Sequence, residues 1–95
     1  AVFCGNDQMA MGLVHALYES GRRVPEDVSV VGFDDLPEAK HSCPPLTTVH
    51  QDFAGIGELA VSVLLAKLDG NPEPDTLPLL PWIVERASTG RPHES

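Results

Sequence analysis

The stretch VSVVGFDD, Val28 to Asp35, is the part of the sequence that is most informative about the fold. It begins with six uncharged residues and ends in two adjacent carboxylates, Asp34 and Asp35. A continuous apolar run of this length is typical of a strand buried on both faces of a parallel sheet. Ligands of such sheets bind just beyond the carboxyl ends of the strands, whereas aspartates before Pro37 also cap turns. The pair is therefore predicted either to bind a ligand or to cap the next turn.

A strand and a helix precede this stretch. Residues 1–4 are apolar, Gly5-Asn6-Asp7 predicts a turn, and residues 8–20 carry apolar side chains at 10, 13, 14 and 17. That spacing forms one helical face, with Asn6 or Asp7 as the N-cap and Gly21 as the stop. Because a crossover of this kind joins parallel strands, both polar turns are expected at one edge of the sheet.

The rest of the chain predicts a second helix and short strands. Prolines at 37, 44 and 45 argue against regular structure in residues 36–45, and residues 46–49 predict a short strand. Apolar positions 53, 56, 60, 64 and 68 predict a helix over 53–68, capped by Asp52 and ended by Gly70. Residues 77–80 and 82–87 are further strand candidates, and the polar segment 88–95 is expected to fray.

Composition narrows the class of function. The chain has 95 residues, enough for one small domain, and a net charge of −8 from six basic and fourteen acidic side chains. The negative electrostatic potential of such a charge repels a phosphate backbone, so the segment is a poor candidate for contact with nucleic acid. Two cysteines and no apolar run long enough for a bilayer favour a cytoplasmic protein. An apolar strand at the very first residue suggests a fragment of a longer chain.

Three motifs taken in order are specific. NDQMA from Asn6, VPEDVSVVGFDD from Val24 and PPLTTVHQDF from Pro44 resemble the carboxyl-terminal part of the effector-binding domain of LacI/GalR-family transcriptional regulators. The resemblance covers nearly the whole chain and implies an α/β, parallel-sheet, periplasmic-binding-protein-like fold, here an incomplete fragment with parts of both subdomains. Residues 1–48 then belong mainly to one subdomain and residues 53–80 mainly to the other, with hinge crossings near 49–52 and 81–86.

The resemblance also implies a ligand site. Family positions that line the effector cleft match Asn6, Asp34, Gln51 and Phe53. Asp34 can accept hydrogen bonds from two vicinal sugar hydroxyls, the amides donate and accept, and Phe53 offers an apolar face. Asp7 and Asp35 fit better as capping or turn residues. No cofactor is expected, and the histidines lack the spacing of a metal site, so they are assigned to the surface or an interface.

The expected function is the ligand-sensing and dimerisation segment of a DNA-binding transcriptional repressor, not an enzyme. The effector is a small molecule, with a sugar favoured, and DNA contact belongs to an amino-terminal helix-turn-helix outside this segment. In the family the homodimer forms through positions that match Met11, Val14, His15, Lys40, His41 and Ser42. The alternative is a sugar-binding protein of a transport system with the same fold, which an export signal in the parent sequence would reveal.

Overall fold

The structure is a computed structural model that describes residues 1–72 and 79–92. It divides into two compact units, one made of Ala1–His50 with Trp82–Ser95 and the other of Gln51–Pro81. We call them unit 1 and unit 2. No helix in the described residues is long and apolar enough to cross a membrane.

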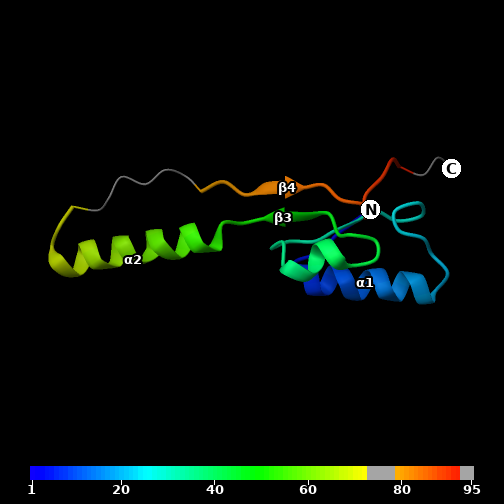
Figure 1. The fold of residues 1–95 in the computed structure, drawn as a ribbon, viewed down its shortest axis with the longest axis horizontal. Helices are drawn as coiled ribbons and strands as arrows, with labels where there is room; N and C mark the ends of the chain where they lie inside the picture. Colours follow the sequence, from blue (N-terminus) through cyan, green and yellow to red (C-terminus); the bar gives the residue numbers. More distant parts are fainter. Residues whose placement is uncertain (73–78, 93–95) are drawn as a thin grey trace. The chain divides into compact units, whose positions relative to one another are not determined.

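Unit 1 opens with the predicted strand–helix–strand. Strand β1 (Val2–Phe3), helix α1 (Asp7–Glu19, blue in Figure 1) and strand β2 (Val30–Val31) follow in order. The strands pair in parallel, with Val2 opposite Val30 and Phe3 opposite Val31, which confirms the expected α/β crossover. The strands are shorter than predicted, and both residues of β1 are exposed.

The cap of α1 is Asn6, which settles the open choice between Asn6 and Asp7. The Asn6 side-chain oxygen accepts a hydrogen bond from the Met9 backbone N–H at 2.8 Å. The helix ends at Glu19 with Ser20 as its C-cap, and Gly21 follows with φ +78°, a left-handed conformation that glycine adopts without steric cost. Ala10 on this helix packs into the core of unit 1 with Cys4, Val30, Ala39 and Leu46.

The segment 36–45 corrects one expectation. A 3₁₀ helix, η1 (Pro37–His41), forms where the prolines had argued against regular structure. Pro37 occupies the first turn, where a helix has no partner for the missing N–H and where the fixed φ of proline is favourable. Ala39 of this turn is fully buried, and its carbonyl accepts a hydrogen bond from Leu46 N at 2.9 Å. The short helix therefore fixes the entry into the next strand.

Strand β3 (Thr48–His50) pairs antiparallel with β4 (Trp82–Val84), and the two lie side by side in Figure 1. Ser88, four residues after the end of β4, is buried, although this segment was predicted to fray. Its backbone carbonyl accepts from Val30 N at 2.9 Å, and its hydroxyl lies 2.6 Å from the Val30 carbonyl. Ser88 thus satisfies both backbone groups of Val30, and Gly90 N donates to the Ser29 hydroxyl at 3.1 Å, so the expectation of a frayed end is wrong for residues 88–90.

Unit 2 contains helix α2 (Phe53–Asp69), with the predicted Asp52 cap and Gly70 stop. Gly70 has φ +71°, and the Asp52 side chain accepts from Gly55 N at 2.9 Å. None of the residues 53–69 is buried, although the helix is rich in apolar side chains. Of the predicted strand 77–80, residues 77 and 78 lie outside the described residues, and Leu79 and Leu80 are not in a strand.

Candidate ligand-binding site

The carboxyl end of β2 has an unusual backbone. Asp34 has φ +116° and Asp35 has φ +56°, the two non-glycine residues with positive φ in the described chain. Such conformations cost roughly 1–3 kcal/mol each and persist only where surrounding contacts determine them. Aspartate tolerates the left-handed region better than most residues. The strand end that the sequence indicated is therefore also a point of stored backbone strain.

Asp34 lies just beyond the carboxyl end of β2. Its backbone N–H donates to the Val49 carbonyl at 2.9 Å, and a parallel bridge joins it to His50. Its side chain is half-buried and makes no hydrogen bond or ion pair with the residues that the structure describes. A carboxylate that is partly exposed and has no donor among the described residues keeps its oxygen atoms available as acceptors for a ligand. Asp34 is therefore the first candidate for ligand contact.

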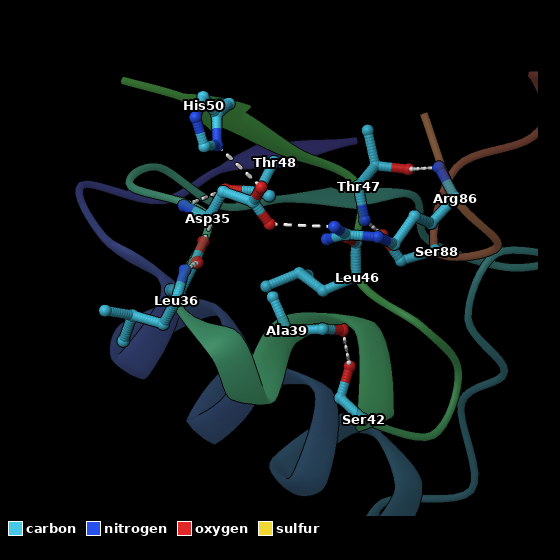
Figure 2. Close-up of polar contacts among 11 residues, drawn as sticks. Asp35, Leu36, Ala39, Ser42, Leu46, Thr47, Thr48, His50, Arg86 and Ser88 are labelled. Carbon is cyan, nitrogen blue, oxygen red and sulfur yellow. Dashed lines mark hydrogen bonds and ion pairs between the residues drawn. The ribbon is translucent and has the colours of Figure 1, made fainter. Parts of the chain in front are cut away.

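Asp35 is the opposite case, since its carboxylate is fully engaged. Oδ1 accepts from Nη2 of Arg86 at 2.8 Å, and Oδ2 lies 2.8 Å from Nδ1 of His50. Figure 2 shows Asp35 between these two side chains. Burial raises the pKa of Asp35, but the hydrogen bonds and charges of Arg86 and His50 outweigh it and hold the pKa below its ordinary value.

Asp7 is a second engaged carboxylate and ties the two polar turns together. It is fully buried, accepts from the Thr48 hydroxyl, and accepts from the Leu36 backbone N–H at 2.7 Å. Its own backbone N–H donates to the Phe33 carbonyl at 3.0 Å. Gly32 leaves the room for this carboxylate, because a Cβ at Gly32 would lie 2.2 Å from an Asp7 oxygen. The 5–7 turn and the 34–35 pair thus meet, as the crossover required.

The four predicted ligand residues divide between the units. Asn6 and Asp34 both follow carboxyl ends of the parallel strands in unit 1, whereas Gln51 and Phe53 belong to unit 2. The side-chain oxygen of Asn6 caps α1. The side-chain amino group of Asn6 makes no hydrogen bond with the described residues, so this group remains a donor for a ligand. Phe53 starts α2 with 55% of its surface exposed. Unit 1 therefore offers an amide and a carboxylate, and unit 2 offers an amide and an exposed aromatic ring.

The six predicted dimer residues line one groove of unit 1, between α1 and the segment 37–43. Two adjoining hollows share Met11 and Ser42; the first, of about 380 Å³, is also lined by Val14 and His15, and the second by Lys40 and His41. His15 and His41 are exposed, as expected for a surface or interface. The structure thus places these residues on one surface, which we call the α1 groove.

Sequence reasoning missed the partners of the engaged carboxylates. Arg86 and Thr48 were given no role, and His50 was expected at a surface or interface. They were missed because each lies far along the chain from the carboxylate it contacts, Arg86 by 51 residues from Asp35 and Thr48 by 41 from Asp7. The available signal was a pair of threonines in a strand candidate, Thr47 and Thr48, since a buried strand favours apolar side chains.

Parallel strands whose carboxyl ends carry an amide and a carboxylate without a partner among the described residues are typical of α/β ligand-binding domains. The chain belongs to the periplasmic binding protein-like domain family, whose model matches residues 1–89.

Known regulators are similar to this chain. The HTH-type transcriptional repressor PurR of Vibrio atlanticus (strain LGP32) is 46% identical over 89 residues, which are 93% of this chain and 27% of that protein. A lac repressor dimer bound to operator and the anti-inducer ONPF matches with a TM-score of 0.83 at 41% identity, over 92% of this chain and 30% of that one. A LacI family regulator from Lactobacillus casei with bound sucrose matches with a TM-score of 0.82 at 37% identity, over 93% and 32%. The chain thus spans about a quarter of the length of its curated relatives.

Proposed function

We propose that this chain is the effector-sensing and dimerising segment of a LacI/GalR-family DNA-binding transcriptional repressor, and not an enzyme. The observation that carries the proposal is the half-buried carboxylate of Asp34 at the carboxyl end of a parallel strand, which has no partner among the described residues. The regulators that resemble the chain support it, one of them with sucrose bound. A cytoplasmic location and the absence of a resident cofactor or metal belong to the same proposal.

The segment belongs, in this proposal, to the carboxyl-terminal part of the effector-binding domain. Units 1 and 2 are parts of its two subdomains, and the chain passes between them after His50 and before Trp82. DNA is contacted by an amino-terminal helix-turn-helix of the parent protein. The net charge of −8 supports this division of labour, because an acidic surface does not bind phosphates.

The effector is a small polyhydroxylated molecule, with a sugar favoured. Asp34 accepts hydrogen bonds from two adjacent hydroxyl groups, Asn6 donates from its free amino group, and Gln51 and Phe53 contribute a polar contact and an apolar face from unit 2. A carboxylate left unpaired by the wrong ligand disfavours its binding, which is the source of selectivity.

The direct test is calorimetry on the full-length parent with a panel of cellobiose, sucrose, galactose, glucose 6-phosphate and guanine. One member should bind saturably, and Asp34→Ala should lower its affinity by about 2–5 kcal/mol. Asp27→Asn is the matched control, since it changes another aspartate of unit 1 that pairs with an arginine, Arg23, and should leave the affinity unchanged. Wild-type affinity in Asp34→Ala would remove Asp34 from the site.

The second part of the proposal is a homodimer through the α1 groove. Met11 lines both hollows of this groove, so Met11→Asp places a charge where an apolar side chain would be covered. Sedimentation velocity of the full-length variant should show a monomer. The control is Glu26→Gln, an exposed residue of the same unit that lines neither hollow, and this variant should remain dimeric. An undisturbed Met11→Asp dimer would place the interface elsewhere.

The alternative, a transport-associated sugar-binding protein, makes a different prediction. A repressor releases or gains an operator when the effector binds, whereas a transport protein has no affinity for DNA. Gel-shift measurements with the parent's own promoter region, with and without the bound panel member, distinguish the two. An effector-dependent shift supports the repressor, and binding of sugar without any DNA binding supports the transport protein.

A further inference from the structure

Asp34 and Asp35 are neighbours, yet among the residues that the structure describes only the carboxylate of Asp35 has side-chain partners. Asp35 contacts two side chains that come from different strands: His50 is the last residue of β3, and Arg86 follows β4 by two positions. The side chains of Asp35 and Arg86 are 15% and 17% exposed, so this ion pair is largely screened from water. Such a contact fixes geometry more firmly than a surface ion pair does.

The contacts on either side of Asp34 leave its turn little freedom. Before it, the backbone is held by the hydrogen bond from Asp34 N to Val49; after it, Asp35 N lies 3.3 Å from the Thr48 hydroxyl. Among these contacts, the side chain of Asp35 alone joins the turn to both β3 and the chain that follows β4. A positive φ at two successive residues needs such external support to persist.

The two strands that Asp35 joins are also the ones that lead into and out of unit 2. β3 ends at His50, immediately before Gln51, and β4 begins at Trp82, immediately after Pro81. His50 and Trp82 are paired across the strands, with ring centroids 4.5 Å apart. Arg86 also contacts the chain that leads into β3, because its Nη1 group donates to the Leu46 carbonyl at 2.9 Å.

We propose that Asp35, Arg86 and His50 form a positioning network that holds the Asp34 carboxylate in its ligand-binding place and ties it to the two connecting strands. Asp35 does not touch the ligand; it acts through the backbone that it shares with Asp34. The inference rests on the proposed function, because it takes Asp34 as the ligand contact. It assigns three residues a role in affinity that the ligand contacts alone would not reveal.

The test is the affinity of the full-length protein for the panel member that binds most tightly. Asp35→Asn and Arg86→Gln should each weaken it about tenfold or more, because a contact displaced by even about 1 Å loses much of its strength. The double variant should be no weaker than the weaker single variant, since both changes break the same ion pair. Asp35→Glu keeps the charge and the reach to Arg86, and it should recover most of the affinity.

Two controls separate positioning from a loss of structure. Ala10→Gly destabilises the buried face of α1 without touching the network, and Asp27→Asn breaks the ion pair with Arg23; both should bind as the wild type does. If Asp35→Asn binds within about twofold of wild type, or if the single effects multiply in the double variant, the positioning network is rejected.

The outcome for Asp34→Ala separates this inference from the proposed function. If Asp34→Ala loses affinity and Asp35→Asn does not, the network fails and the ligand site stands. If Asp34→Ala binds normally, or if no panel member binds the wild type, both fail together.

Discussion

Units 1 and 2 both contain many apolar side chains, but several of these are buried in unit 1 and none is buried in helix α2 of unit 2. Unit 1 closes a core of five buried residues, among them Val30 and Leu46 with no exposed surface. Unit 2 contains the longer helix, α2, in which Leu64 is 57% and Leu68 is 72% exposed. Local signals suffice to form a helix of 17 residues with proper caps, but they do not bury it. We therefore predict that apolar partners outside the described residues cover α2.

The largest effect on stability should come from the core of unit 1. Leu46→Ala in the full-length protein removes a fully buried side chain and should lower the free energy of unfolding by about 2–5 kcal/mol. Leu64→Ala in α2 tests the contrast between the units. If the rest of the parent covers this helix, this substitution should lower the free energy of unfolding by at least about 2 kcal/mol, although Leu64 is exposed in the described chain. Urea denaturation followed by circular dichroism measures both.

The control for this pair is Arg22→Gln, an exposed substitution in unit 1 that should change the free energy of unfolding by less than about 0.5 kcal/mol. A Leu64→Ala variant as stable as the wild type would show that α2 stays uncovered in the whole protein. The contrast between the units would then be a property of the intact molecule.

A smaller effect should follow from the buried carboxylate that joins the two polar turns. Thr48→Val keeps the side-chain shape and removes both the donor to the fully buried Asp7 and the acceptor of the longer hydrogen bond from Asp35 N. Leaving one oxygen of this carboxylate unsatisfied should cost about 1–3 kcal/mol. Thr48→Ser retains the hydroxyl and serves as the matched variant. Equal unfolding free energies for the valine and serine variants would contradict this role of Thr48.

The smallest effect concerns acid stability. Since the folded pKa of Asp35 lies below its unfolded value, its contribution to stability is present above the unfolded pKa, about 4. That contribution is lost as the pH falls through the folded pKa. Asp35→Asn should therefore lower stability at neutral pH and flatten its decline below about pH 4. Urea midpoints across this range test it, and parallel curves for the two proteins would show that Asp35 contributes nothing.

Much of the fold follows from local patterns. The helix over residues 53–69 and its stop at Gly70 are predictable because apolar spacing, an Asp cap and a glycine act within a few residues. The parallel pairing of β1 and β2 is predictable because the crossover between them has one preferred topology. The η1 helix was missed because Pro37 was taken as a breaker, although proline fits the first turn of a helix.

The local sequence shows that two carboxylates end the strand, and only the resemblance to a family separated Asp34, as a ligand residue, from Asp35, as a capping or turn residue. The local pattern left open which of the two carboxylates the rest of the chain holds. Tertiary structure decided it: Arg86 and His50 are brought to Asp35, and Asp34 is left unpaired among the described residues. Ser88, predicted to fray, is buried for the same reason, since its partners are the Thr47 N–H and the Val30 carbonyl. Hydrogen-bond partners 41 to 58 residues apart leave no local signal, because only the folded chain brings them within reach.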